Sequence, residues 1–320
     1  MEILIIALPL LASIISGFFG KFIGDRNSEI VTSFLVTISA ILSIIVFYEV
    51  IFNQYQDNIT IATWIDSGSL NVNWSIKIDS LSAVMLVVVT SISSLVHVYS
   101  IGYMSHDPHK PRFMAYLSLF TFAMLMLVTS DNFIQLFFGW EGVGLCSYFL
   151  IGFWFKKDTA NSAAIKAFLV NRIGDFGFAL GIFLIFYLFG TVNYSEVFEL
   201  IPTIIDKELL FLGIEVKAID LICLLLFVGA MGKSAQILLH TWLPDAMEGP
   251  TSVSALIHAA TMVTAGVFLV VRCSPIYEYS ELALNVITVV GMSTAFFAAT
   301  IALVQTDIKK IIAYSTCSQL

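Results

Sequence analysis

Apolar runs long enough to cross a membrane recur along this sequence and constrain its fold more than any other feature. A bilayer-spanning helix needs about 20 predominantly apolar residues. Hydrophobic residues make up 58% of the 320 residues and charged residues only 12%, whereas a soluble domain carries about 25% charged residues. The sequence therefore predicts an all-α polytopic membrane protein and excludes the soluble classes.

The runs predict about nine complete transmembrane helices and a partial tenth. The expected spans are 3–23, 30–52, 80–103, 113–130, 132–155, 162–190, 218–239, 251–272 and 282–303, with a further helix starting near Lys309. The final residues, IIAYSTCSQL, lie inside an apolar pattern, so we expect the chain to be the N-terminal part of a longer protein. Residues 58–78 alternate apolar and polar side chains around Asp66–Ser69, which predicts a short β-hairpin.

Charged residues divide the loops into two alternating groups. The basic group contains Lys21, Arg26, Lys110, Arg112, Lys156, Lys157, Lys309 and Lys310, and the acidic group contains Asp57, Asp66, Asp131, Glu196, Glu199, Asp206, Glu208, Glu215, Glu278 and Glu281. Basic loops remain in the cytoplasm as a rule. We therefore expect the N-terminus and the hairpin to lie on the outer side.

The sequence gives no sign of a cofactor or a metal. The four cysteines are far apart, without the spacing of a disulfide framework, a zinc site or an iron–sulfur site. No GxGxxG fingerprint or Walker loop is present. The net charge of −8 is spread thinly and predicts no nucleic-acid partner.

Two charged residues, Glu141 and Lys233, lie deep inside apolar runs. Such a charge costs at least about 2.5–3.5 kcal/mol at the bilayer centre, and intramembrane charges usually pair, face a wet cavity or carry ions. Glu141 is flanked by Gly139, Gly142 and Gly144, which let another helix approach closely. The alternatives are a static ion pair for Glu141 and, for Lys233, a side chain that extends to the membrane interface.

Further ionisable residues lie on neighbouring predicted helices. Asp175 and Arg172 are three residues apart, so we expect them to pair within their helix, although Asp175 can instead tune a lysine on another helix. His258 has small and hydroxyl-bearing neighbours, which favours a proton relay over a simply packed histidine. His97 has fewer such neighbours and is expected to be structural.

A break is expected after the predicted helix 218–239. Pro244 and then Gly249–Pro250 interrupt the apolar pattern, and the polar residues around them include His240 and Asp245. Proline removes a backbone donor from a helix. Broken helices line ion cavities in transporters, while an ordinary turn between two helices is the alternative.

Four segments together resemble the antiporter-like, proton-translocating membrane subunits of NADH:quinone oxidoreductase (complex I), and most closely the subunit L branch of that family. The segments are GWEGVGLCSYFLIGFWF, NRIGDFGF, GAMGKSAQILLHTWLPDAMEGPTSVSALIHAATMVTAGVFLVVR and QTDIKKIIAYSTCSQL. The resemblance implies two inverted five-helix repeats, each with one discontinuous helix. Residues 1–112 would hold helices one to three and the hairpin, 113–272 the first repeat with discontinuous helix seven, and 273–320 the truncated start of the second repeat.

The resemblance also implies a function and its residues. Glu141, Lys233, His258 and Asp175 would carry proton translocation, driven by electron transfer from NADH to quinone in other subunits. The chain itself would hold no cofactor, while NADH, flavin, iron–sulfur clusters and quinone would belong to partner subunits. The implied partners are other complex I membrane subunits, especially a neighbouring antiporter-like subunit, and membrane lipids. The expected location is the bacterial plasma membrane, with the mitochondrial inner membrane as the alternative.

Other functions remain open on the sequence. The large subunit of an Mrp-type sodium/proton antiporter shares the same motifs and would act without redox coupling. Related hydrogenase- or formate-linked complexes are a further possibility. A non-conducting membrane scaffold is a different class, but it would not need so many buried charges.

Overall fold

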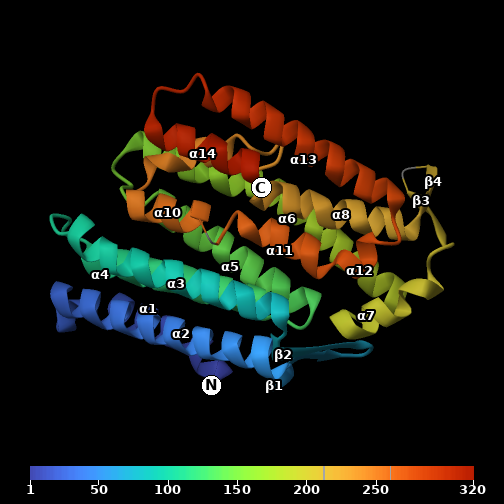
Figure 1. Cartoon of the computed structure of the whole chain (residues 1–320), viewed down its shortest axis with the longest axis horizontal. Helices are drawn as coiled ribbons and strands as arrows, with labels where there is room; N and C mark the ends of the chain where they lie inside the picture. The colour runs from blue at the N-terminus through green and yellow to red at the C-terminus, as the bar shows by residue number, and fades with distance from the viewer. Residues whose placement is uncertain (212, 260) are drawn as a thin grey trace.

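The chain folds into a bundle of long helices that lie side by side, with small hairpins at one end (Figure 1). The structure is a computed structural model and describes residues 1–211, 213–259 and 261–320. The long helices are α1 (Glu2–Ile23), α2 (Asp25–Asn53), α3 (Ser80–Tyr103), α4 (Lys110–Val128), α5 (Phe133–Ile151), α6 (Asp158–Phe189), α8 (Ala218–Lys233) and α13 (Glu281–Ala302). The shorter ones are α7 (Tyr194–Leu200), α9 (Trp242–Asp245), α10 (Thr251–Ala259), α11 (Thr264–Arg272), α12 (Ser274–Tyr277) and α14 (Ile308–Gln319).

Seven of the described helices are long and apolar enough to cross a membrane, which agrees with the predicted membrane class. These are α1, α2, α3, α4, α5, α6 and α13. Two other predicted spans differ from the structure. The run 218–239 is helical only to Lys233, and the run 251–272 is divided into α10 and α11.

Glycines allow the helices at the centre of the bundle to approach closely. A Cβ atom added at Gly139 of α5 would lie 2.6 Å from the backbone nitrogen of Leu127 in α4. One added at Gly229 of α8 would lie 2.6 Å from the Cβ of Phe178 in α6. Neither position has room for a larger side chain, so α5 and α8 are held close to their neighbours.

The predicted hairpin is present. Strand β1 (Asp57–Ser67) pairs antiparallel with β2 (Leu70–Ile78), and Gly68 supplies the positive φ of 62° at the turn. The side chain of Gln135 in α5 holds β2 by accepting from the Ser75 N–H and donating to its carbonyl. A second hairpin, β3 (Glu208–Phe211) with β4 (Ile214–Lys217), was not predicted, because strands of four residues are too short to show an alternation.

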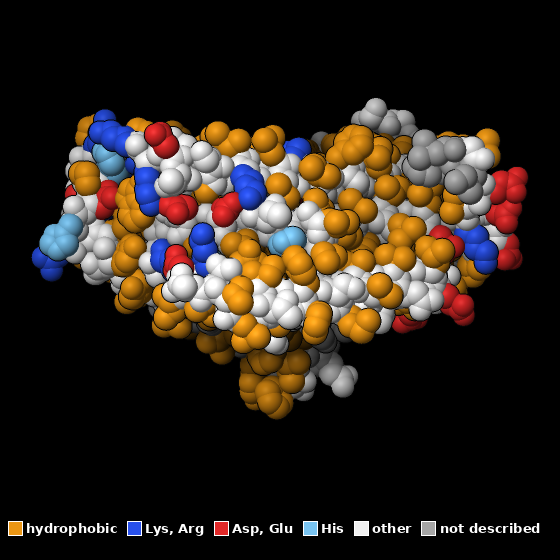
Figure 2. Space-filling view, turned by 90° about the horizontal axis from the view of Figure 1, so that it is seen from above, with side chains coloured by type: hydrophobic (Ala, Val, Ile, Leu, Met, Phe, Trp, Pro, Cys, Tyr) orange, Lys and Arg blue, Asp and Glu red, His pale blue; other side chains and the backbone are white. Residues whose placement is uncertain are grey.

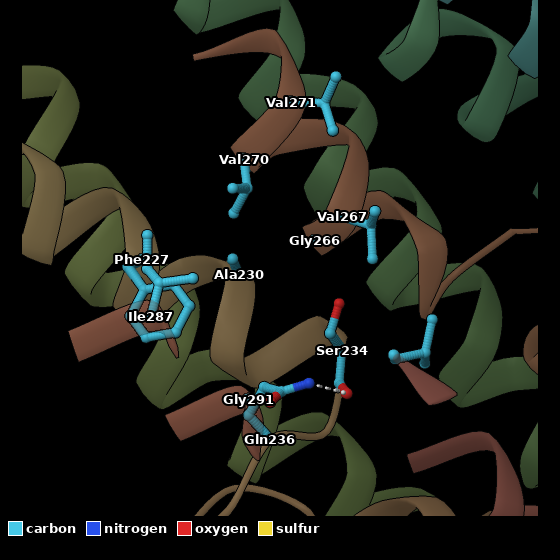
Figure 3. A pocket seen from close by; sticks show the side chains of 11 residues that line it. Phe227, Ala230, Ser234, Gln236, Gly266, Val267, Val270, Val271, Ile287 and Gly291 are labelled. Atoms are coloured by element: carbon cyan, nitrogen blue, oxygen red, sulfur yellow. Dashed lines mark hydrogen bonds between the residues drawn. The ribbon is translucent and has the colours of Figure 1, made fainter. Parts of the chain in front are cut away.

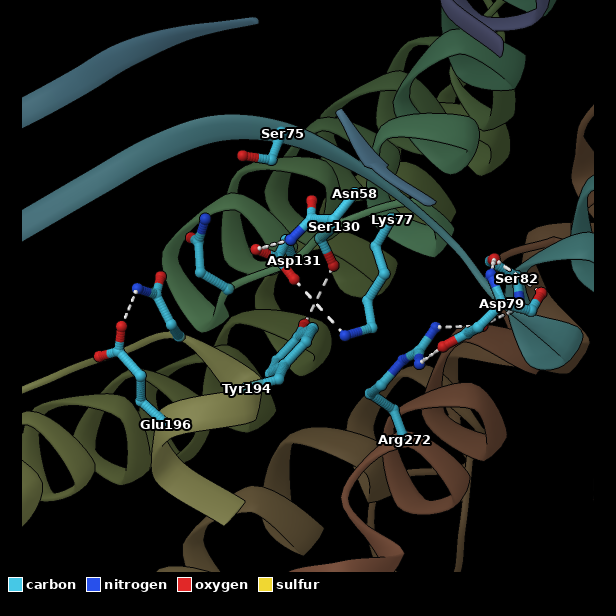
Figure 4. Close-up of polar contacts among 12 residues, drawn as sticks. Asn58, Ser75, Lys77, Asp79, Ser82, Ser130, Asp131, Tyr194, Glu196 and Arg272 are labelled. Carbon is cyan, nitrogen blue, oxygen red and sulfur yellow. Dashed lines mark hydrogen bonds and ion pairs between the residues drawn. The ribbon is translucent and has the colours of Figure 1, made fainter. Parts of the chain in front are cut away.

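A polar network joins the first hairpin to the helices that end beside it (Figure 4). Arg272, the last residue of α11, pairs with Asp79, which caps the N-terminus of α3. Lys77 of β2 lies 3.5 Å from Asp131, and Asn58 of β1 donates to the same carboxylate at 2.8 Å. The network fixes α11 at this end of the bundle.

The predicted basic loops gather at the opposite end. There Lys110 approaches Glu29 at 3.9 Å, and Lys309 donates to the carbonyl of Gly249 at 3.3 Å. Blue side chains are concentrated toward the left end in Figure 2, which is the end of the α3–α4 and α5–α6 loops in Figure 1. The alternation of charge along the sequence therefore corresponds to two ends of the molecule.

Candidate functional site

Lys233 is the most buried charged residue of the site. It ends α8, and its exposed fraction is 0%. Its Nζ lies 3.7 Å from Oδ1 of Asp175 in α6 and 5.6 Å from the centre of the Trp140 ring, and it makes no hydrogen bond to any described residue. The alternative of a lysine extended to the membrane interface is therefore wrong.

Asp175 contacts Lys233 of α8 and does not pair with Arg172 of its own helix. It is 3% exposed, and its Oδ1 accepts a hydrogen bond of 2.6 Å from Nε1 of Trp140. The expected pair with Arg172 is wrong, because Arg172 lies on the outer flank of α6 and contacts Glu141 of α5. The other expectation, that Asp175 accompanies a lysine on a neighbouring helix, agrees with the structure.

Glu141 lies farther out than Lys233 and Asp175, at the surface of the bundle. Its side chain is 23% exposed and that of its partner Arg172 is 45% exposed. The resemblance implies that Glu141 acts together with Lys233, but the two side chains form no ion pair in the described structure, because each has another partner of opposite charge. The preceding residue, Trp140, is the contact that joins α5 to Asp175.

The break in the chain comes directly after Lys233, several residues earlier than the sequence predicted. Ala235 and Leu238 have positive φ angles of 49° and 77°, which end the helix without glycine or proline. The freed backbone groups find partners outside the helix. The Ile237 N–H donates to Oγ1 of Thr294 at 2.9 Å, and Nε1 of Trp242 donates to the Gly232 carbonyl at 3.0 Å.

A second break, which was not predicted, packs against the first. It separates α10 from α11, and the Ser234 hydroxyl donates across to the Val263 carbonyl at 2.7 Å. A Cβ added at Gly266 of α11 would lie 2.6 Å from the carbonyl oxygen of Ala230 in α8. The expected single helix over 251–272 is therefore wrong, and beside the break the Thr261 hydroxyl donates to the Leu256 carbonyl at 2.6 Å.

A small cavity of 140 Å³ lies beside the first break, between α8, α11 and α13 (Figure 3). Ser234 and Gln236 supply its polar side, and Val267, Val270 and Ile287 are among its apolar residues. A cavity with polar partners and this volume is large enough for water. The residue that follows Lys233 therefore lines a space that can be hydrated.

His258 lies in the last turn of α10, beside the second break. It is 7% exposed, and neither ring nitrogen has a hydrogen-bond partner among the described residues. It lines a cavity of 270 Å³ together with Ser254, Lys309 and Thr316. His97, in contrast, bonds to the Ser93 carbonyl at 2.7 Å and to Ser118 at 3.0 Å, as expected of a structural histidine.

Two further ion pairs lie at the basic end, between α6 and the segment after the first break. Lys166 contacts Asp245 and Lys157 contacts Glu248, each at 2.6 Å. The hydrogen bonds from Lys157 and Thr159 hold the pKa of Glu248 below its ordinary value. The sequence indicates that this segment is polar but does not indicate these partners, since residues about 80 to 90 positions apart in the chain show no local pattern.

No group of three or more His, Cys, Asp or Glu side chains that could hold a metal ion occurs among residues 1–211, 213–259 and 261–320. The site is instead a set of single acids and bases on α5, α6, α8 and α10. Such a set can exchange protons between neighbours or through water.

Comparison with known protein families shows to which family the chain belongs. Residues 130–320 match the family described as "NADH:quinone oxidoreductase/Mrp antiporter, TM", and residues 64–114 match "NADH-Ubiquinone oxidoreductase (complex I), chain 5 N-terminus". The chain belongs to the NADH:quinone oxidoreductase/Mrp antiporter family. The resemblance found in the sequence is thereby confirmed.

Curated relatives carry complex I names. NADH-ubiquinone oxidoreductase chain 5 of Triticum aestivum is 61% identical over 320 residues, which are 100% of this chain and 48% of that protein. NADH-quinone oxidoreductase subunit L of Rickettsia bellii is 56% identical over 318 residues, which are 99% of this chain and 50% of that protein. The chain thus spans about half the length of the curated relatives it matches.

Solved structures of membrane complexes share the fold. A chain of the Mrp complex from Dietzia sp. DQ12-45-1b is 27% identical with a TM-score of 0.83, and the match covers 99% of this chain and 33% of that one. A chain of an archaeal membrane-bound sulfane sulfur reductase has a TM-score of 0.85 at 20% identity over 99% of this chain and 62% of that one. The second likeness concerns the fold alone.

Proposed function

We propose that this chain is a proton-translocating membrane-arm subunit of respiratory NADH:quinone oxidoreductase, an enzyme complex. The observation that carries the proposal is Lys233, a fully buried ammonium group at the end of a broken helix, 3.7 Å from a buried carboxylate. A charge in this position is costly, and it is retained here beside two breaks in the backbone. The names of the relatives support electron transfer from NADH to quinone as the source of energy.

Lys233 is proposed to take up and release a proton, with Asp175 setting the stability of its charged form. A separation of 3.7 Å is beyond hydrogen-bond distance, so the ion pair is not closed and the lysine stays available to another partner. Trp140 restrains Asp175 through its indole N–H. Movement of the carboxylate toward or away from the ammonium would then favour or disfavour the protonated lysine.

His258 is proposed to pass the proton between this lysine and the basic end. Its unpartnered ring nitrogens and its cavity support the role, because buried polar atoms normally bind a partner or water. Lys309, which lines the same cavity, lies in the first turn of α14 at the basic end. Glu141 would transmit a change of charge from outside the chain, through Trp140 and Asp175.

Other complex I membrane subunits are the proposed partners, with an antiporter-like subunit against α5 and α6. The Glu141–Arg172 pair is partly exposed on a face where Leu169, Ile173 and Phe176 are also exposed. An ion pair in contact with lipid tails is unfavourable. A protein partner that covers this pair removes the cost, and the cofactors NADH, flavin, iron–sulfur clusters and quinone are assigned to other subunits of the complex.

The domain organisation and orientation follow the same proposal. Helices α4 to α11, residues 113–272, form the first antiporter-like repeat with α8 as its discontinuous helix, and residues 273–320 begin the second. The end with the basic loops faces the cytoplasm in a bacterial plasma membrane, or the matrix in a mitochondrial inner membrane, and the N-terminus faces the other side.

The proposal is tested by NADH-driven proton uptake in inverted membrane vesicles that contain the full-length protein with Lys233→Ala. We expect the complex to assemble, and proton uptake and NADH-dependent quinone reduction to be lost together. Lys207→Ala, an exposed lysine before β3, is the control and retains both activities. Full proton uptake in Lys233→Ala membranes contradicts the proposal.

The large subunit of an Mrp-type sodium/proton antiporter is the second candidate, favoured by the match to the Mrp complex over 99% of this chain. The same vesicles distinguish the two functions. Normal NADH-driven uptake in Lys233→Ala membranes, with loss of sodium/proton exchange, assigns the chain to the antiporter.

A further inference from the structure

A cavity of 530 Å³ lies at the basic end, between the α3–α4 loop and the α5–α6 loop. Its charged and hydrogen-bonding lining residues include Asp107, His109, Arg112, Trp154, Lys156 and Lys157. The cavity is separate from the residues proposed to move protons. It belongs to the end of the bundle where basic side chains are concentrated (Figure 2).

The cavity has an excess of positive charge. Its acidic residue, Asp107, accepts hydrogen bonds from Nε1 of Trp154 and from the backbone N–H of His109. Lys157 is already paired with Glu248. Arg112 and Lys156 form no ion pair with any carboxylate in the described part of the chain, so both charges remain available to an anion.

Arg112 is held in place by aromatic rings. Its guanidinium lies 4.7 Å from the centre of the Phe153 ring and 5.3 Å from that of Phe155, and it donates to the Phe153 carbonyl at 3.4 Å. Its Nε is buried and has no hydrogen-bond partner among the described residues. Arg112 also lies in the first turn of α4, where the positive end of the helix dipole adds to the attraction for an anion.

An aromatic groove of 240 Å³ continues from this cavity along α4 and α5. It shares Arg112, Phe153 and Phe155 with the cavity. Tyr116 and Phe149 stack within it with ring centres 5.4 Å apart. Both helices are long and apolar enough to cross a membrane. The groove therefore leads from the charged cavity toward the hydrocarbon region.

We propose that the cavity and the groove together bind an anionic phospholipid. Arg112 and Lys156 bind the phosphate, and the acyl chain lies along Tyr116 and Phe149. This proposal rests on the orientation given under the proposed function, in which the basic end faces the cytoplasm or matrix. Basic pockets between transmembrane helices on that side suit anionic headgroups, and an arginine fork matches a phosphate. The aromatic groove favours a lipid over free inorganic phosphate, which would use the cavity alone.

The test is photo-crosslinking in the purified complex with the full-length protein, using phosphatidylglycerol that carries a diazirine in an acyl chain. We expect the lipid to label peptides that contain Tyr116 or Phe149, and the matching phosphatidylcholine probe to label them weakly. Each basic residue contributes about fivefold to the affinity for an anionic lipid. Lys156→Gln should therefore reduce labelling at subsaturating probe about fivefold, and Arg112→Gln with Lys156→Gln about 25-fold.

The control is Lys21→Gln, which removes an exposed basic residue at the same end and should leave labelling unchanged. Lys156 is exposed, so its substitution tests the site even where the Arg112 variant fails to assemble. Equal labelling by phosphatidylcholine, or unchanged labelling in Lys156→Gln, overturns the proposal. Loss of labelling in millimolar inorganic phosphate at constant ionic strength assigns the site to a free anion and also overturns it.

Discussion

At the scale of single residues, Lys233 is buried without a hydrogen-bond partner for its ammonium group among the described residues. The side chain is fully buried, yet its closest carboxylate oxygen is 3.7 Å away and also binds Trp140. Removing one partner of a buried pair usually costs about 3–5 kcal/mol, because the other charge is left alone. The ammonium of Lys233 is therefore buried beside a carboxylate that it does not reach at hydrogen-bond distance.

The position of the ammonium group depends on a glycine in α5. A Cβ added at Gly144 would lie 2.8 Å from Nζ of Lys233, so the flexible end of the lysine must move. We expect Gly144→Ala to leave the complex assembled, since only a mobile atom is displaced, and to reduce NADH-driven proton uptake tenfold or more. A shift of about 1 Å in a reacting group can cost about 100-fold in rate.

Gly142→Ala is the control for that experiment. A Cβ added at Gly142 would lie 3.1 Å from the Cβ of Ala123 in α4. The variant therefore tests the packing of the same helix without contacting the lysine. Equal losses in the two variants would assign the effect to helix packing and contradict a role for the lysine position.

At the scale of secondary-structure elements, the sequence predicted most helices but misplaced the break. Long apolar runs such as 80–103 show their helix directly, and α3 has these bounds. The run 218–239 continues apolar through Ala235 and Leu238, so nothing local indicates that α8 ends at Lys233. The break exists because partners distant in the sequence, Thr294 and Val263, bind the groups around it.

The same limit applies to the candidate site. Glu141, Lys233 and Asp175 could be found from the sequence, because each is an ionisable residue in an apolar run. Their partners could not, because the i to i+3 spacing of Arg172 and Asp175 suggested a pair that tertiary contacts replace. Packing of α6 against α5 and α8 decides which side of the helix each residue faces.

Thr294 tests how the first break is held. Its hydroxyl oxygen accepts from the Ile237 N–H, and the residue is 2% exposed. Thr294→Val leaves this donor unpaired, which costs about 1–3 kcal/mol. We expect a lower midpoint of thermal unfolding for the full-length protein in detergent and reduced proton uptake. Thr294→Ser keeps the acceptor and should behave like the wild type, whereas equal effects of both substitutions would argue against the hydrogen bond.

At the scale of the whole molecule, charge is distributed between the ends and one lateral face. The two ends are explained by loops that contact water, and this division could be predicted from the sequence. The Glu141–Arg172 pair could not be assigned to a surface, because no sequence pattern distinguishes a face covered by protein from one covered by lipid. Its partial exposure places the pair on the outer surface of the chain, which supports the proposed partner.

The proposed interface predicts where a neighbouring subunit can be crosslinked. Ile173 is 60% exposed and directly follows Arg172. Phe34 on α2 is similarly exposed, at 63%, but lies far from the Glu141–Arg172 pair in the sequence and serves as the comparison. In the assembled complex with the full-length protein, we expect a photoreactive benzoylphenylalanine at position 173 to form adducts with a second membrane subunit, visible as a band of higher mass. The same group at position 34 should form mainly lipid adducts. Lipid adducts alone at position 173 would show that the ion pair faces the bilayer, and the cost of its charge would then have to be offset within this chain.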